Sequence, residues 1–228
     1  MTRSPTPDTK RTVAWCAGGF LLAIAVGVLY ARQLVAVDAW RDGLPWERAL
    51  LLGLHTRHGP VLDWILLIVP WFGTNVTMIP LAAVAAIWLW RHGGGPIATR
   101  ILTVVAGSFM MNVLLKHWYD RPRPTLWEWR GQFAWASFPS GHSIASVSVP
   151  FTIAILLHRE LGWRWPFLGA AALLIVTVYS RLYLGVHWPS DVITGLIMGM
   201  IWLLATHTAF RGPPGASERP PATAAGAK

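Results

Sequence analysis

Three short polar clusters interrupt a largely apolar chain, and they contain the residue types that bind and transfer phosphate. The clusters are Lys116 with Arg123; Ser140 with Gly141 and His142; and Arg181 with His187 and Asp191. Arginine binds phosphate oxygens in bidentate geometry, and lysine binds them as a point charge. Three unpaired cations beside an apolar bundle would be costly to desolvate. An anion with several oxygens, such as phosphate, is therefore the expected occupant.

The second cluster adds backbone and hydroxyl donors to this predicted site. Ser140 and Gly141 directly precede an apolar run, so they are expected at the start of a helix. Such a start directs unpaired N–H groups at an anion. Gly141 would let the backbone approach closely, and Ser140 would donate its hydroxyl. We therefore expect Lys116, Arg123 and Arg181 to bind phosphate together with these two residues.

The two histidines of the clusters suit different steps of phosphoryl transfer. A neutral imidazole can accept a phosphoryl group, and His187 is the better nucleophile because Asp191 lies four residues later. A helix starting near Pro189 would let this carboxylate reach the ring and fix its tautomer. His142 suits the general acid, and later the base that activates water. Neither a metal nor another cofactor is expected, since the nearby cations would repel a further cation.

Six apolar runs are predicted to span a membrane and to position these clusters. They cover residues 13–30, 74–90, 97–115, 143–157, 166–184 and 192–209. A spanning helix needs about 17–25 residues, so the run at 61–69 is expected to be interfacial or packed in the bundle. The clusters fall at the end of the third span, the start of the fourth and the link between the last two. The number of crossings therefore places all three at one face of an all-α, six-helix membrane bundle.

Composition and charge support a membrane protein and indicate its orientation. Only 13% of the 228 residues are charged and 54% are hydrophobic, whereas a soluble domain has about 25% charged residues. Lysine and arginine flank the apolar runs and are in excess on the side of both termini. We therefore expect cytoplasmic termini in a cell inner (plasma) membrane, with the site on the outer face.

The same distribution of charge limits the expected partners. The net charge is +9, but it is spread over span ends rather than gathered into one patch. Nucleic-acid binding is therefore not expected, whereas membrane lipids and a lipid phosphate substrate are. No obligate protein partner is evident. The single cysteine, Cys16, excludes an intrachain disulfide and a cysteine metal cluster.

The chain is expected to form one membrane domain between two tails. Residues 1–12 would be a cytoplasmic tail, residues 13–209 the six-helix domain, and residues 210–228 a disordered cytoplasmic tail, since they are rich in Pro, Ala and Gly. The first span is expected to be retained rather than removed as a signal peptide, because no clean small-x-small cleavage site follows it.

The clusters together resemble the three signature motifs of the type 2 phosphatidic acid phosphatase superfamily, to which vanadium haloperoxidases and glucose-6-phosphatase also belong. The matching segments are Lys116-x6-Arg123-Pro124, Pro139-Ser140-Gly141-His142 and Ser180-Arg181-x5-His187-x3-Asp191. The resemblance implies a metal-independent, outward-facing membrane phosphatase with a phosphohistidine at His187. It implies a lipid phosphate or diphosphate as substrate, with undecaprenyl diphosphate or phosphatidylglycerol phosphate favoured.

Other activities compatible with the same residues remain open. A lipid phosphotransferase would pass the phosphoryl group to another lipid instead of water. A vanadate-dependent oxidant would bind vanadate in the same place, although the haloperoxidases are soluble. A non-enzymatic lipid-phosphate binder would need no nucleophile. The role of Arg121 also stays open between phosphate binding and a position in the loop.

Overall fold

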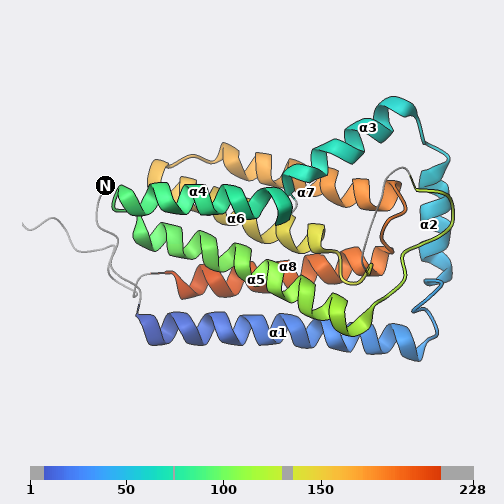
Figure 1. Ribbon diagram of the computed structural model, residues 1–228, viewed down its shortest axis with the longest axis horizontal. Coiled ribbons are helices and arrows are strands. Elements are labelled where there is room, and N and C mark those ends of the chain that lie inside the picture. Colours follow the sequence, from blue (N-terminus) through green and yellow to red (C-terminus); the bar gives the residue numbers. More distant parts are fainter. Residues whose placement is uncertain (1–7, 74, 130–135, 212–228) are drawn as a thin grey trace, which may run out of the picture.

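All regular elements in the described part of the chain are helices. The computed structural model describes residues 8–73, 75–129 and 136–211 (Figure 1). The elements are α1 (Thr9–Ala36), α2 (Pro45–His55), α3 (Pro60–Ile68), the 3-10 helix η1 (Val69–Gly73), α4 (Asn75–Arg91), α5 (Gly95–Tyr119), α6 (Gly141–Leu161), α7 (Trp165–Tyr183) and α8 (Pro189–Ala209). The expected all-α class is confirmed for these residues.

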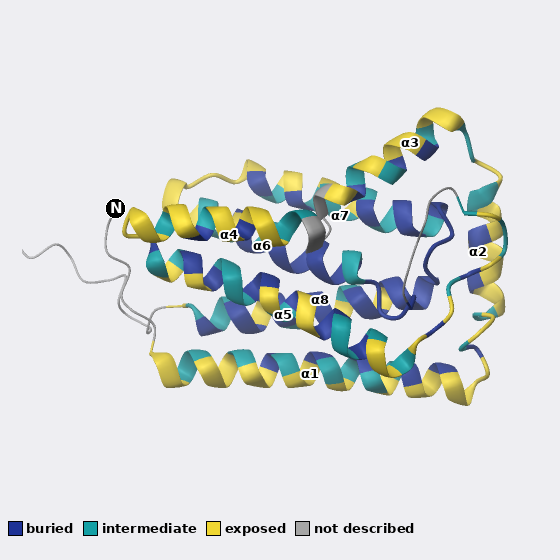
Figure 2. Ribbon diagram, viewed as in Figure 1, coloured by how far each residue is buried: buried dark blue, intermediate teal, exposed yellow. Residues whose placement is uncertain are grey.

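Five described helices are long and apolar enough to cross a membrane, namely α1, α5, α6, α7 and α8. The remaining predicted span, residues 74–90, corresponds to α4, which has 17 residues and is shorter than these five. Helix α4 packs along α5 in the bundle (Figure 1). Large apolar side chains stay exposed on the outer faces of the helices (Figure 2), as expected where the surrounding solvent is lipid.

The helix starts follow local signals in the sequence. Helix α1 begins at Thr9, where the Asp8 side chain accepts a hydrogen bond from the Lys10 backbone N–H at 3.0 Å. Residues 9–12, which the sequence places in the N-terminal tail, are therefore helical. Residues 1–7 and 212–228 of the predicted tails lie outside the described residues. Helix α8 begins at Pro189, as expected for a proline in a first turn.

Helix α8 is packed between α1 and α6, and small residues bring it close to α6. A Cβ atom on Gly195 would lie 2.6 Å from the carbonyl oxygen of Ser140, and one on Gly199 would lie 2.7 Å from that of Ile144. Such close backbone approach between spanning helices requires residues without bulky side chains. This packing holds the start of α6 beside the start of α8, where the second and third polar clusters lie.

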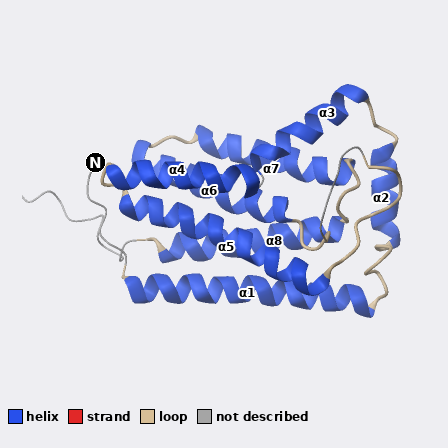
Figure 3. Ribbon diagram, viewed as in Figure 1, coloured by secondary structure: helices blue, strands red, loops and turns tan. Residues whose placement is uncertain are grey.

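The longest connections gather at the end of the bundle away from the N-terminus. Figure 3 shows the loops that follow α5 and α7 at this end, with α2 lying across it. Helix α2 contacts α7 there. Every predicted site residue lies in or beside these loops.

Candidate active site

The structure brings both histidines of the polar clusters against arginines. Arg123, in the loop after α5, places Nη1 3.3 Å from Nε2 of His187, and Arg181, in the last turn of α7, places Nη1 3.3 Å from Nε2 of His142. Lys116, in the last turn of α5, joins these two arginines in acting electrostatically on both rings. Five of the predicted site residues therefore converge around one point.

The contacts of His187 define which of its nitrogens can react. A guanidinium group only donates hydrogen bonds, so Nε2 beside Arg123 is the acceptor nitrogen and has a lone pair. We infer that Nδ1 has the proton. It lies 3.5 Å from Oδ2 of Asp191, longer than an ordinary hydrogen bond, and the backbone of Ser137 also interacts with the ring. Catalytic hydrogen bonds are often long before substrate binds.

Burial and positive charge keep the His187 ring neutral. Burial lowers the pKa of His187 well below its usual range, and the charges of Arg123, Lys116 and Arg181 lower it further. Burial also lowers the pKa of Arg123 to about 10, although Asp191 opposes this effect. Arg123 is therefore still a cation at neutral pH, while His187 is a neutral imidazole.

Hydrogen-bond donors other than His187 hold the Asp191 carboxylate in place. Its Oδ2 accepts from the backbone N–H of Trp188 at 2.8 Å and from the hydroxyl of Ser137 at 2.7 Å. Its Oδ1 accepts from Nη1 of Arg121 at 2.6 Å. The carboxylate is completely buried. It is therefore held in one orientation, with an oxygen toward the His187 ring.

Arg121 lies in the loop after α5, which was one of the two alternatives left open by the sequence, and its donors are used within the protein. It is completely buried and donates to the carbonyls of Trp40 at 2.9 Å and Ala39 at 3.0 Å, and to the hydroxyl of Ser190 at 2.8 Å. Together with its bond to Asp191, these contacts make it a structural cation behind the site.

Glu47 belongs to the same buried network and was not identified from the sequence. Its two oxygens accept from the backbone N–H groups of Leu44 and Ser190, each at 2.7 Å, and one lies 4.0 Å from Nη2 of Arg121. The side chain is completely buried. Glu47 therefore attaches α2 to the start of α8. A lone glutamate in the first turn of an amphipathic segment was the only local signal.

Ser140 and Gly141 have packing contacts where the sequence predicts phosphate contacts. The Ser140 hydroxyl is completely buried and accepts from the Ser143 backbone N–H at 3.4 Å, so it caps α6. A Cβ atom on Gly141 would lie 2.6 Å from Oδ1 of Asn112 on α5. Their contribution to phosphate binding stays a prediction. The first backbone N–H groups of α6 are predicted to bind the same phosphate.

The remaining predicted cations also contact protein groups. Lys116 donates to the carbonyl of Ala136. Arg181 donates through Nη2 to the Ser180 hydroxyl at 2.8 Å, whereas its buried Nε has no hydrogen-bond partner among the described residues. An anion at this point would satisfy that donor. Within the described part of the chain, no group of three or more His, Cys, Asp or Glu gathers in a way that could hold a metal ion.

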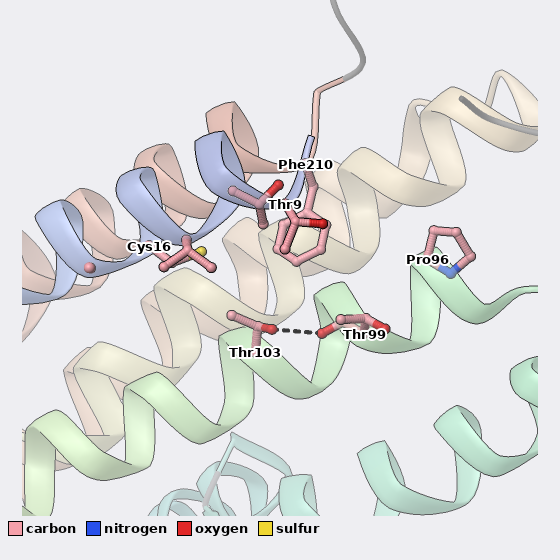
Figure 4. Close-up of a pocket in the computed structure, with 9 residues that line it drawn as sticks. Thr9, Cys16, Pro96, Thr99, Thr103 and Phe210 are labelled. Atoms are coloured by element: carbon pink, nitrogen blue, oxygen red, sulfur yellow. Dashed lines mark hydrogen bonds between the residues drawn. The ribbon is translucent and has the colours of Figure 1, made fainter. Parts of the chain in front are cut away.

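Two cavities differ in their relation to the site. One of ≈ 470 Å³ is lined by Lys116 and by His117, Asp120 and Ala136, so it opens beside the cations. The other, of ≈ 600 Å³, lies between α1, α5 and Phe210 at the opposite end of the bundle (Figure 4). Only the smaller cavity is adjacent to the residues discussed above.

The fold and site define a helical membrane protein with a buried histidine, His187, and a partly buried one, His142, surrounded by cations. The model of the PAP2 superfamily matches residues 97–212, half of the chain, and this region contains all eight predicted site residues. The chain therefore belongs to the PAP2 superfamily, which confirms the resemblance in its motifs.

Relatives and solved structures are consistent with this membership. YbjG of Escherichia coli (strain K12), assigned as an undecaprenyl-diphosphatase, is 33% identical over 57% of this chain and 65% of its own, just under two thirds of its length. Phosphatidylglycerophosphatase B of Bacillus subtilis (strain 168) is 26% identical over 62% of this chain and 72% of its own. A transmembrane PAP2 type phosphatidylglycerolphosphate phosphatase from Bacillus subtilis superposes with a TM-score of 0.69, at 22% identity, over 82% of this chain and 94% of its own.

Proposed function

We propose that the protein is a metal-independent lipid phosphatase that hydrolyses a lipid phosphate or diphosphate through a phosphohistidine at His187. The observation that carries the proposal is the arrangement around this ring. Nε2 has a lone pair 3.3 Å from an arginine donor, and Nδ1 faces a fixed carboxylate at 3.5 Å. A phosphoryl group bound by Arg123 would lie directly in front of the reactive nitrogen.

The first step forms the phosphoenzyme. The lone pair of His187 Nε2 attacks the terminal phosphorus while the bond from this phosphorus to the leaving oxygen breaks. The leaving oxygen is the lipid oxygen of a monophosphate or the bridging oxygen of a diphosphate. His142 donates its proton to the leaving oxygen, and the negative charge of the substrate favours the protonated form of this ring beforehand. Asp191 stabilises the positive charge that develops on His187, and Lys116, Arg123 and Arg181 stabilise the equatorial oxygens.

The second step releases inorganic phosphate. His142, now neutral, removes a proton from water as the water oxygen attacks phosphorus. The bond from phosphorus to Nε2 breaks, and its electron pair returns to His187. Both histidines then have their starting protonation states, and no metal or other cofactor takes part.

The names of the relatives support undecaprenyl diphosphate or phosphatidylglycerol phosphate as the substrate of this chain. A lipid substrate would reach the cations through the cavity beside Lys116, with its tail among the helices.

The excess of Lys and Arg at the end of the bundle with both termini supports six spans, including α4, in a cell inner membrane. In this orientation the termini are cytoplasmic and the site faces outward.

Phosphate release from purified protein in detergent with EDTA tests the activity. Undecaprenyl diphosphate, phosphatidylglycerol phosphate and phosphatidic acid would be compared, with His187→Ala as the control. Release that continues in EDTA and disappears in the variant is expected, and the relative rates would identify the substrate class. If the folded protein releases no phosphate from any of the three, the hydrolase proposal is wrong; appearance of a phosphorylated acceptor lipid would indicate phosphotransfer instead.

A further inference from the structure

A second group of cations lies at the end of the bundle opposite the histidines. Arg100 lies near the start of α5, Arg159 near the end of α6, and His207 and Arg211 at or just beyond the end of α8. Arg100 is only 2% exposed. Arg159 and Arg211 are exposed, and His207 is partly buried. The proposed phosphatase reaction uses none of these residues, so the burial of Arg100 and the charge gathered around it need a separate explanation.

This group contains more hydrogen-bond donors than acceptors. Nη2 of Arg100 lies 3.2 Å from Nδ1 of His207, and Nε of Arg211 lies 3.0 Å from Nε2 of the same ring. A neutral imidazole has one acceptor nitrogen, and guanidinium groups only donate. Two arginine donors therefore compete for a single lone pair. The buried Nε of Arg100 has no hydrogen-bond partner among the described residues.

The charges of the group are also unbalanced. Arg159 and Arg211 both act electrostatically on Arg100 and on His207. Among the described residues, no carboxylate lies within 4.0 Å of Arg100, Arg159 or Arg211. A buried cation without a counter-charge is strongly destabilising.

The buried Arg121 provides a direct comparison within the same protein. It is completely buried like Arg100, but it has Asp191 at 2.6 Å and Glu47 at 4.0 Å as counter-charges. Of these two arginines, only Arg100 has a buried donor without a hydrogen-bond partner among the described residues. Within the described part of the chain, Arg100 therefore lacks the counter-charges that Arg121 has.

We propose that Arg100, Arg159, His207 and Arg211 form a second anion site, which binds a phosphate-type oxyanion as a lipid headgroup or as free phosphate. Such an anion offers several acceptors to converging arginines. The lipid source is included because Thr99 and Phe210, the chain neighbours of Arg100 and Arg211, line the largely apolar cavity of ≈ 600 Å³ (Figure 4). The site is separate from the one that would perform hydrolysis.

Inorganic phosphate tests the free-anion source. Binding would be followed through the melting temperature of the full chain in detergent, with phosphate titrated against chloride at constant ionic strength. An Arg123→Gln background weakens phosphate binding at the histidines. The test variant is Arg159→Gln/Arg211→Gln, and the matched control is Arg91→Gln/Arg164→Gln, which removes two exposed arginines from the same end. The apparent dissociation constant is expected to rise about tenfold or more in the test variant and to stay unchanged in the control.

Phosphatidic acid tests the lipid source in the same proteins. Mixed micelles with phosphatidic acid or phosphatidylcholine would be analysed by native mass spectrometry. Retention of phosphatidic acid that is lost only in the test variant would identify a headgroup site, whereas a response to inorganic phosphate alone would identify a free-anion site. If the test and control variants bind both inorganic phosphate and phosphatidic acid equally, the proposal is overturned.

Discussion

His187 is an acceptor toward Arg123 at one nitrogen and faces a fixed carboxylate at the other. This asymmetry matters because a nucleophilic imidazole must be neutral before attack and must tolerate positive charge afterwards. Burial and three cations favour the neutral ring, and Asp191 stabilises the charged one. Phosphoryl transfer to Nε2 would also bring negative oxygens to those cations.

The pH dependence of activity follows from the lowered pKa of His187. Because the ring becomes protonated only well below its usual range, kcat/KM should stay high as pH falls through 6.5. Arg123→Gln removes the cation with the largest electrostatic effect on this ring. The pKa should rise, and the acidic limb of the profile should move to higher pH, while activity falls about 10²–10³-fold.

The control for this profile is Arg48→Gln, which removes a surface arginine whose side chain is 46% exposed. Its acidic limb should coincide with that of the unmodified protein. An acidic limb that stays in place or moves to lower pH in Arg123→Gln would disprove the assigned electrostatic effect.

Arg121 should be essential to stability as well as to the geometry of Asp191. Arg121→Leu would leave the carboxylates of Glu47 and Asp191 buried without a counter-charge. We expect the free energy of unfolding to decrease by about 3–5 kcal/mol. Arg48→Leu removes only the exposed contact with Asp42 and should change it by about 0–1 kcal/mol. Denaturation in detergent would measure both; equal effects would contradict a structural role for Arg121.

Three contacts between helices determine where the histidines lie. Glycines on α8 let α6 approach, and Glu47 attaches α2 to the first turn of α8. The backbone N–H of Ser140 donates to the carbonyl of Asp191 at 3.0 Å, so the starts of α6 and α8 are directly bonded. The position of His142 relative to His187 therefore depends on helix packing.

Gly195→Ala should test this packing. The added Cβ would lie 2.6 Å from the backbone oxygen of Ser140, so a helix must move to relieve the contact. We expect a loss of about 1–3 kcal/mol in unfolding free energy and a decrease in kcat of up to about 10²-fold. Gly53→Ala has no heavy atom within 4 Å of its Cβ, and should stabilise α2 by about 0.5–1 kcal/mol. An unchanged kcat in Gly195→Ala would contradict the dependence on helix packing.

Local signals in the sequence predicted the starts of helices and contacts within one turn. Asp191 was placed beside His187 because the two are four residues apart at a proline-initiated helix start. By contrast, Arg121 bonds to groups 69 to 82 residues away in sequence. Such contacts have no periodic pattern, since loop geometry and the position of α2 determine them. The functions of Arg121 and Glu47 could therefore not be predicted from the sequence.

Close contacts between helices could not be predicted from the sequence either. Gly141 is still predicted to approach an anion, and nothing in the sequence indicated that its lack of a side chain also accommodates Asn112 of α5. The end of α1 was placed at residue 30, whereas the helix continues to Ala36 because polar residues such as Gln33 are compatible with a helix.

At the scale of the whole molecule, the polar loops and α2 cover one end, and both ends of the described chain lie at the other (Figure 1). The apolar outer faces in between suit a lipid environment (Figure 2). In the proposed orientation, the substrate phosphate is hydrolysed at the outer surface, and the second anion site faces the cytoplasm.

Cysteine labelling in intact cells would test this orientation. Cys16 is the single cysteine of the chain, so Cys16→Ser provides a background without thiols. In this background, His117→Cys is expected to react with a membrane-impermeant maleimide applied outside, whereas Arg91→Cys is expected to react only after lysis. Both positions are exposed. The opposite labelling pattern would place the histidines on the cytoplasmic side.

Rapid acid-free quenching of the purified protein, after mixing with a lipid labelled with ³²P at its terminal phosphate, would detect the covalent phosphohistidine. We expect label on the protein, attached to His187 through an acid-labile and alkali-stable bond. The label should persist longer in His142→Ala, where water activation is slow, and should be absent in His187→Ala. Phosphate release at the normal rate by His187→Ala, or label on another residue, would contradict the account.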